Sequence, residues 1–242
     1  MKRAVFIDWD DTLGDWATAA WQAQQDVYAH FHIATWGVSF EQWFDTYHAH
    51  NTELWHRYSH SEIDKTYLML DRFLYPICVA KGITTAEGTA YHTLAMAMSD
   101  YFLVRTNAHF CLLPDAQETV RYLADKYVLT VISNGFEEVQ YDKLRQSGLL
   151  PYFAYVVLSD EVGVLKPDAR IFEVALRRNR RTLPDLEKAD VVMIGDSWHS
   201  DIEGARNAGI DAIWVTRQDL DDRTVAGGVQ IVRSLRELMD VL

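Results

Sequence analysis

Short apolar runs alternate with amphipathic stretches along most of this chain. The runs are rich in β-branched residues and too short for ordinary helices, and so we interpret them as strands buried on both faces. They cover residues 4–8, 127–132, 155–158, 191–194 and 212–215, and a candidate edge strand follows at 229–232. Because helical patterns lie between the runs, the chain is predicted to form an α/β fold with a doubly wound parallel sheet.

One long segment interrupts this alternation. Between the first and second runs, roughly 100 residues show helical periodicity and no convincing strand, which is far longer than an ordinary connection. We therefore expect an α-helical cap domain, residues 14–111, inserted into a Rossmann-like core made of residues 1–13 and 112–242.

Local signals support helices inside the insert. Ser39 and Thr84 each precede a glutamine or a glutamate by three residues, the spacing of a capping box at a helix start. The stretches 61–74 and 87–104 carry apolar residues on one helical face. In the core, a helix over 200–208 is predicted to end at Gly209.

Carboxylates follow the first apolar run directly. Asp8 ends that run and Asp10 lies two residues later, so a turn can hold the two side chains close together. One carboxylate can attack phosphorus as a nucleophile while the other moves a proton. Taken alone, the same pattern is equally typical of an acidic turn that caps a helix.

A second acidic pair, Asp196 and Asp201, follows the run at 191–194. Together with Asp8 and Asp10 it would gather negative charge at one edge of the sheet, which is unfavourable without a cation. Oxygen ligands favour Mg²⁺, and Asp201 is expected to support the loop or a metal-bound water. By itself this segment is also typical of a helix N-cap.

Three further polar residues complete the set. Ser133 and Asn134 end the second run before a helix, where a hydroxyl, an amide and backbone N–H groups can bind a phosphate oxygen. Lys166 precedes a proline at a predicted helix start and can reach both the phosphate and the attacking carboxylate. A lone lysine is usually solvated, and so the prediction depends on the combination of all four segments.

The four segments in this order resemble the motifs of the haloacid dehalogenase-like hydrolase superfamily. They lie at residues 8–12, 133–135, 166–167 and 195–201, and the helical insert is where the first type of cap sits in that family. The resemblance implies a mechanism through an aspartyl-phosphate, with Asp8 as nucleophile and Asp10 as general acid/base. It also implies Mg²⁺ at Asp8, Asp196 and the Asp10 carbonyl, phosphate at Ser133, Asn134 and Lys166, and supporting roles for Thr12 and Asp201.

The presence of Asp10 favours a phosphatase, because the dehalogenases of this superfamily lack the second acidic residue of the first motif. A narrower resemblance, carried by residues 51–55, 133–136 and 159–167, is to the bacterial pyrimidine 5′-nucleotidases. It implies a nucleoside monophosphate as substrate. Two alternatives stay open: a sugar-phosphate phosphatase or phosphosugar mutase, and a non-catalytic module that binds a phosphorylated ligand.

Aromatic residues are candidates for contacts with the substrate. Five of the eight tryptophans lie in the insert, where each is more typical of the cap core than of a binding surface. Trp16 is the best candidate for contacting the leaving group, and Trp9 can narrow the entrance to the active site. His56 and His60 have the spacing of a zinc-binding pair, but Arg57 stands where the zincin pattern has glutamate, and so no histidine metal site is predicted.

Charge and hydropathy limit the partners. The net charge of −12, without a long basic run, argues against nucleic acid and against an anionic membrane surface. No apolar run approaches the roughly 20 residues of a membrane span, and the first residues do not read as a signal peptide. We expect a cytoplasmic monomer or homodimer that acts on a small phosphorylated metabolite, first of all a nucleotide.

Overall fold

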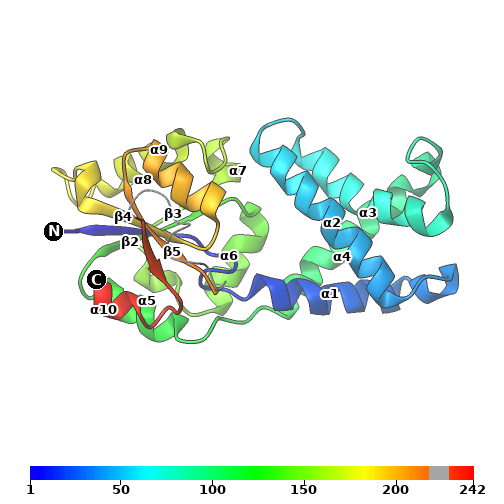
Figure 1. Cartoon of the computed structure of the whole chain (residues 1–242), viewed down its shortest axis with the longest axis horizontal. Coiled ribbons are helices and arrows are strands. Elements are labelled where there is room, and N and C mark those ends of the chain that lie inside the picture. Colours follow the sequence, from blue (N-terminus) through cyan, green and yellow to red (C-terminus); the bar gives the residue numbers. More distant parts are fainter. Residues whose placement is uncertain (218–228) are drawn as a thin grey trace. The chain divides into compact units, whose positions relative to one another are not determined.

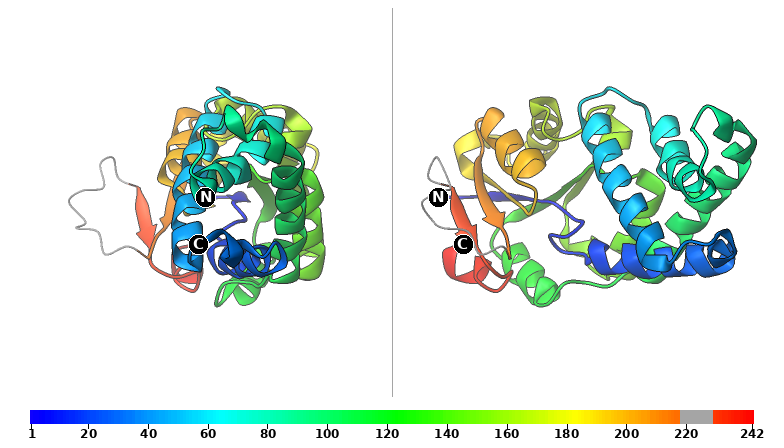
Figure 2. Two further views of the ribbon diagram at one scale, coloured as in Figure 1. Left: turned by 90° about the vertical axis from the view of Figure 1, so that its right-hand side faces the viewer. Right: turned by 45° about the vertical axis from the view of Figure 1, so that its right-hand side comes forward.

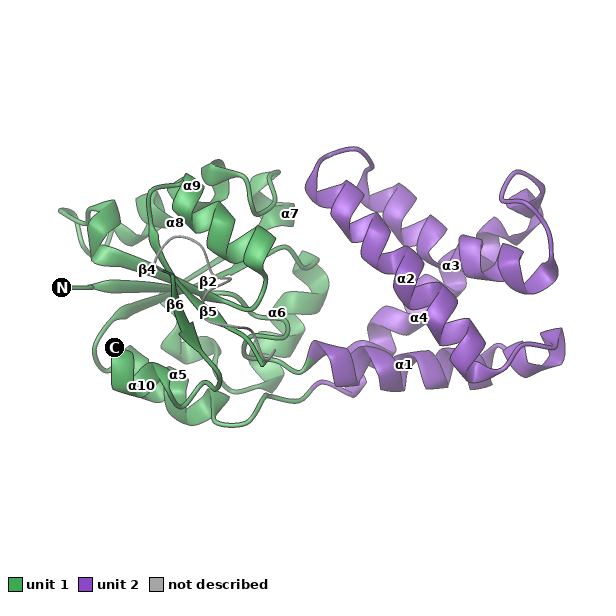
Figure 3. Cartoon of the chain, viewed as in Figure 1, with its two compact units in different colours: residues 1–15, 111–242 green, residues 16–110 purple. Residues whose placement is uncertain are grey.

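The structure is a computed structural model that describes residues 1–217 and 229–242 and divides the chain into two compact units. Unit 1 comprises Met1–Asp15 and Cys111–Leu242, and unit 2 comprises Trp16–Phe110 (Figure 3). Unit 2 begins two residues later and ends one residue earlier than the insert expected from the sequence.

Unit 1 is built on a parallel sheet of six strands in the order β3-β2-β1-β4-β5-β6 (Figure 1). The strands are β1 (Ala4–Ile7), β2 (Val128–Ser133), β3 (Tyr155–Leu158), β4 (Val191–Gly195), β5 (Asp211–Val215) and β6 (Gln230–Val232). The predicted doubly wound sheet is confirmed, with β6 at one edge. Because β1 lies between β2 and β4, the residues that follow these three strands meet at the same edge of the sheet.

Helices cover both faces of the sheet, which explains why the strands read as continuous apolar runs. Figure 1 shows α8 and α9 on one face and α5 and α10 on the other. On the first face, Phe172 of α8 shares a buried cluster with Phe6 of β1 and Met193 of β4. The helices of unit 1 are α5 (Ala116–Ala124), α6 (Glu137–Gln146), α7 (Ser159–Val162), α8 (Ala169–Asn179), α9 (Gly204–Asn207) and α10 (Leu238–Val241).

Unit 2 is helical and has its own apolar core. Its helices are α1 (Trp16–His30), α2 (Phe40–Ser59), α3 (Lys65–Lys81) and α4 (His92–Ala108), which lie beside one another in the blue-to-green part of Figure 2. Trp43, Phe73 and Phe102, from three of these helices, lie in one buried cluster. Since this core is made only of unit 2 residues, the insert has the internal packing of a domain.

The helix starts in unit 2 follow the predicted signals in part. The capping box at Ser39 is confirmed at the start of α2. Thr84 and Glu87 make the same kind of contacts, but a short 3₁₀ helix, Glu87–Tyr91, follows them and α4 begins only after it. The stretch predicted from Ser61 begins later, at α3, because Asp64 caps that helix.

The helix predicted over 200–208 also differs. A wider π-type turn, Trp198–Glu203, comes first, and α9 follows it and ends before Gly209, whose φ is 75°. Ser197 starts the turn because its side chain accepts a hydrogen bond from the Ser200 N–H.

The length and apolar character of the described helices bear on whether one of them can span a lipid bilayer. None of those in residues 1–217 and 229–242 combines sufficient length with sufficient apolar character to cross a membrane.

Candidate active site

The turn after β1 presents Asp8 and Asp10. Asp8 directly follows Ile7, and its backbone N–H donates to the carbonyl of Ile194 in β4 at 2.9 Å. The turn closes at Asp11, whose φ of 61° lies in the left-handed region that aspartate tolerates better than most residues. Asp8 is buried and Asp10 is half-buried, and both come from one tight turn at the carboxyl edge of the sheet.

Lys166 is a buried cation beside Asp8. Its Nζ atom lies 2.5 Å from Asp8 Oδ1, 2.6 Å from Asp201 Oδ1 and 2.8 Å from the carbonyl oxygen of Ile132. These three contacts use all three ammonium protons. Burial by itself lowers the pKa of Lys166, but the carboxylates of Asp201 and Asp8 outweigh it and raise this pKa above its ordinary value. Lys166 is therefore held as an ammonium group.

Thr12 connects the first turn to Asp196, which follows β4. Thr12 Oγ1 lies 3.0 Å from Asp8 Oδ2 and 3.0 Å from Asp196 Oδ1, and it also accepts the backbone N–H of Asp196. Since a hydroxyl has one proton, Thr12 can donate to only one of the two carboxylates at a time. This geometry supports the role expected for Thr12.

Asp201 is fully buried and anchors the loop that carries Asp196. Its Oδ2 atom accepts the backbone N–H of Ser197 at 3.0 Å, while Oδ1 faces Lys166. A Cβ atom at Gly195 would lie 2.2 Å from Asp201 Oδ2, and so this close approach depends on glycine. Both oxygens of Asp201 accept hydrogen bonds from the protein, which fits the supporting role expected for this residue.

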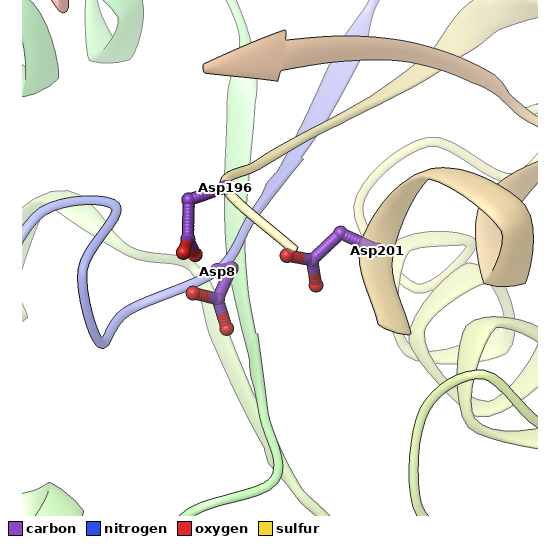
Figure 4. A group of neighbouring side chains, drawn as sticks. All are labelled: Asp8, Asp196 and Asp201. Carbon is purple, nitrogen blue, oxygen red and sulfur yellow. The ribbon is translucent and has the colours of Figure 1, made fainter. Parts of the chain in front are cut away.

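Three carboxylates converge at this edge. Oxygens of Asp8, Asp196 and Asp201 lie within 4.8 Å of one another (Figure 4). If all three carboxylates were ionised, the ammonium group of Lys166 beside them would leave two negative charges uncompensated. Burial raises the pKa of Asp8 well above its ordinary range against the opposing effect of Lys166, and burial together with Asp201 raises that of Asp196 to about 7. A divalent cation would balance the charge, and this all-oxygen donor set fits Mg²⁺.

Ser133 and Asn134 follow β2 at the same edge. Ser133 Oγ accepts hydrogen bonds from the Gly135 N–H at 3.0 Å and from Gln140 Nε2 at 2.7 Å. Asn134 pairs with the backbone of Lys166, donating to its carbonyl oxygen at 2.9 Å and accepting its N–H at 2.8 Å. Asn134 thus holds the Lys166 segment in place, and its contact with a phosphate stays a prediction.

Two residues of α6 that the sequence analysis does not identify also reach the site. Gln140 Nε2 lies 2.7 Å from Asp10 Oδ2, and Lys143 Nζ lies 2.7 Å from Asp10 Oδ1. Both side chains are buried, each with 1% of its residue surface exposed. Their spacing on the same helical face as Val139 and Leu144 is a usable signal, because a polar side chain on a buried face needs a partner.

The structure places Trp9 differently from the prediction. Its side chain has no exposed surface and packs edge-to-face on Phe153, with ring centroids 6.4 Å apart. Because none of its surface is exposed, Trp9 does not narrow an entrance as the sequence analysis expects. Trp16 belongs to unit 2, where it packs on Phe102 at 6.1 Å, and its contact with a leaving group stays a prediction.

Comparison with known proteins points to one family. A family model described as haloacid dehalogenase-like hydrolase matches residues 2–209. The chain is 28% identical over 239 residues to pyrimidine 5′-nucleotidase YjjG of Escherichia coli (strain K12), and the match covers 98% of this chain and 96% of the relative. It is 31% identical over 252 residues to a glyceraldehyde 3-phosphate phosphatase of Methanothermobacter thermautotrophicus, with 100% of both chains covered.

A solved structure shares the fold. The HAD-hydrolase YfnB of Bacillus subtilis, in a crystal form bound to magnesium, matches with a TM-score of 0.84 over 100% of this chain and 98% of that chain. At 23% identity this likeness concerns the fold alone. It agrees with the parallel sheet and the helical insert described above.

Proposed function

Since the chain belongs to the haloacid dehalogenase-like hydrolase family, we propose that it is a magnesium-dependent phosphomonoester hydrolase that works through a phosphorylated Asp8. The observation that carries the proposal is the surroundings of Asp8. Lys166 Nζ lies 2.5 Å from it, and oxygens of Asp196 and Asp201 lie within 4.8 Å. Two relatives that match along nearly the whole chain, one named as a nucleotidase and one as a phosphatase, support the reaction type.

The first half-reaction is the transfer of a phosphoryl group to Asp8. A carboxylate oxygen of Asp8 attacks phosphorus, and the bond from phosphorus to the leaving oxygen breaks. Asp10, two residues away in the same turn, donates a proton to that oxygen.

The second half-reaction releases phosphate. Asp10 takes a proton from a water molecule, whose oxygen bonds to phosphorus, and the bond from phosphorus to Asp8 breaks. The net reaction is hydrolysis of the ester, and both aspartates return to their starting states.

The residues around Asp8 offset the charge of the phosphate. Lys166 supplies a fixed ammonium group, and the Ser133 hydroxyl can donate to a phosphoryl oxygen. Mg²⁺, when held by Asp8, Asp196 and the backbone carbonyl of Asp10, would supply the positive charge that lets an anionic nucleophile approach an anionic ester.

Among substrates we propose a pyrimidine nucleoside monophosphate. The support is the match to a pyrimidine 5′-nucleotidase, which covers 98% of this chain. A second candidate, a sugar or triose phosphate, is favoured by the match to a glyceraldehyde 3-phosphate phosphatase, which covers the whole chain at 31% identity. Both are small phosphorylated metabolites.

A phosphate-release screen tests the proposal. The purified protein is incubated with Mg²⁺ and a panel of nucleoside monophosphates, sugar phosphates and p-nitrophenyl phosphate, beside Asp8→Asn as the matched control. We expect release with the wild type, a loss of at least about 10³-fold in Asp8→Asn, and inhibition by EDTA. No release above the control from any ester would sink the catalytic proposal and would favour a binding module.

Product analysis separates the remaining alternatives. Free phosphate and a nucleoside from a nucleotide support the nucleotidase, while preferred turnover of sugar phosphates supports the second candidate. A rearranged phosphosugar without free phosphate would instead identify a mutase.

A further inference from the structure

Helix α6 holds both oxygens of Asp10. Lys143 Nζ lies 2.7 Å from Oδ1, and Gln140 Nε2 lies 2.7 Å from Oδ2. The two side chains are three residues apart and so project from the same face of the helix. Asp10 itself is only half-buried, with 28% of its side chain exposed, and without these contacts several orientations would be open to it.

Gln140 also determines whether the Ser133 hydroxyl donates or accepts a hydrogen bond toward a ligand. In its ionised state, which follows proton donation, Asp10 only accepts hydrogen bonds, so the Gln140 atom that faces it is the amide nitrogen, and the second proton of this nitrogen points to Ser133 Oγ at 2.7 Å. Ser133 Oγ accepts a further bond from the Gly135 N–H at 3.0 Å. Because two donors occupy the lone pairs of this oxygen, the hydroxyl proton of Ser133 is left to donate.

The stability of the fold does not explain why Gln140 and Lys143 are polar residues at buried positions. Gln140 Oε1 is buried and has no hydrogen-bond partner within residues 1–217 and 229–242, which is unfavourable. Lys143 is a buried ammonium group. Apolar residues of similar size in place of a buried ion pair usually give a protein of equal or greater stability. Space for Gln140 exists only because Gly135 lacks a side chain, since a Cβ atom there would lie 2.0 Å from Gln140 Nε2.

We propose that Gln140 and Lys143 are positioning residues for the two functional groups they touch. Lys143 fixes the orientation of Asp10 toward the leaving oxygen and the attacking water. Gln140 sets Ser133 as a hydrogen-bond donor to a phosphoryl oxygen and links it to Asp10. This inference rests on the proposed phosphatase function.

The two residues have different expected effects on the kinetics. Proton transfer to the leaving oxygen matters most when that oxygen is strongly basic, as in an alkyl ester, and least for p-nitrophenolate. A fault in the orientation of Asp10 therefore lowers kcat/KM more for an alkyl phosphate than for p-nitrophenyl phosphate. Loss of the Gln140 contact with Ser133 weakens phosphate binding as well, and so raises KM.

The test compares Lys143→Met, Lys143→Arg and Gln140→Met with Arg145→Met, an exposed position on the same helix. For the best alkyl phosphate of the screen, we expect Lys143→Met to lower kcat about 10- to 100-fold with little change in KM, part of the 10²- to 10⁴-fold that a general acid/base contributes. Lys143→Arg should recover part of the loss, and Gln140→Met should change both kcat and KM. Arg145→Met should match the wild type.

A double-mutant cycle separates positioning from a structural role. If Lys143 acts through Asp10, Lys143→Met should cost little in an Asp10→Asn background, whereas independent structural damage would add to the loss. Circular dichroism and urea unfolding show whether each variant is folded. If Lys143→Met does not fold, the cycle of Gln140→Met with Asp10→Asn tests the inference instead. Methionine has nearly the volume of glutamine, and so Gln140→Met should disturb the packing little.

The inference and the proposed function fail in different ways. A wild type without turnover above Asp8→Asn overturns the function. When the wild type is active, the inference is overturned if Lys143→Met and Gln140→Met fold and have the same kcat and KM as Arg145→Met. Equal losses for alkyl and p-nitrophenyl phosphates, or full additivity with Asp10→Asn, overturn it as well.

Discussion

Lys166 is the residue on which the charge balance of the proposed active site depends. It is the cation that contacts both Asp8 and Asp201, and its third proton is taken by a backbone carbonyl. Asp196 adds a further carboxylate nearby. The same buried charges therefore affect both catalysis and folding stability, and variants at these positions need both measurements.

Replacing Lys166 with methionine should lower both the folding stability and the catalytic activity. The change leaves Asp8 and Asp201 buried without their cation, and removing one partner of a buried ion pair costs about 3–5 kcal/mol in the free energy of unfolding. We expect activity to fall at least about 10²-fold, because the fixed charge beside the nucleophile is lost. Urea unfolding and phosphate release measure the two effects. Lys81→Met, on the exposed surface, is the control, and equal stability of the two variants would contradict the argument.

Asp196 should make the metal-free protein less stable as pH rises. Burial raises its pKa from 3.8 to about 7, and so between about pH 4 and pH 7 the folded state binds a proton that the unfolded chain has released. The stability that this proton contributes is therefore lost as pH increases through this window. Urea unfolding in EDTA at several pH values measures the decline, which should be smaller in Asp196→Asn.

Magnesium should reverse this decline. The cation binds the deprotonated carboxylates, so its stabilising effect should grow with pH and with its concentration. Thermal unfolding with and without Mg²⁺ at pH 7 measures it. If Asp196→Asn gained as much from Mg²⁺ as the wild type does, Asp196 would not be a ligand.

Helix starts are the elements in which local sequence acts most directly on structure. At the start of α2, the Gln42 N–H donates to Ser39 Oγ at 3.2 Å, and the Ser39 N–H donates to Gln42 Oε1 at 3.0 Å. At the start of α3, the Tyr67 N–H donates to Asp64 Oδ1 at 2.7 Å. Each contact joins residues three apart, and so it forms with little regard to the rest of the fold.

Ser39→Ala should destabilise unit 2 without affecting the chemistry. Loss of the cap leaves backbone N–H groups at the start of α2 without their partner and should cost about 1 kcal/mol. Urea unfolding measures the cost, and turnover of p-nitrophenyl phosphate measures the chemistry. Ser59→Ala, at the other end of the helix, should stay within about 0.5 kcal/mol of the wild type. A larger loss at Ser59 than at Ser39 would show that the cap contributes little.

Element α6 shows the opposite case. The helical pattern indicates that Gln140 and Lys143 need polar partners, but it does not indicate that the partner is Asp10, which lies 130 and 133 residues earlier in the chain. The helix ends at Gln146, two residues before Gly148 with its φ of 70°, and this end follows from local pattern. The targets of its polar side chains follow instead from packing against the sheet.

For the whole molecule, the two units have separate cores and separate expected tasks. The sheet unit contains the groups proposed for catalysis, and the helical unit contains most of the tryptophans. The chain leaves and re-enters unit 1 at neighbouring points, since the Asp15 N–H donates to the carbonyl of Cys111 at 2.9 Å. A short linker can therefore replace the whole of unit 2.

Removing unit 2 should erode selectivity more than intrinsic reactivity. We expect a variant with residues 16–110 replaced by a short Gly/Ser linker to turn over p-nitrophenyl phosphate, but to discriminate less among natural esters. The same substrate panel measures this, with Asp8→Asn in the shortened protein as the control. If the folded shortened protein kept the full-length ranking of substrates, the helical unit would not select the substrate.

The sequence by itself determined the strands, and it indicated the helical insert and the four polar segments at residues 8–12, 133–135, 166–167 and 195–201. Buried parallel strands must be apolar along their whole length, and so each one is visible as a contiguous run. The position of Asp8 at the end of the first run and of Asp196 after the fourth then follows from strand order alone. These are short-range features, and the structure reproduces them with boundary changes of a few residues.

Only the tertiary structure decided which partners these groups have. Trp9 lies in the core rather than at an opening, Asn134 pairs with the backbone of Lys166, and Gln140 and Lys143 hold Asp10. Each of these outcomes depends on segments that are distant in sequence and meet only when the sheet is assembled. Local propensity cannot predict such contacts, because the burial that makes a polar partner necessary is itself a property of the complete fold.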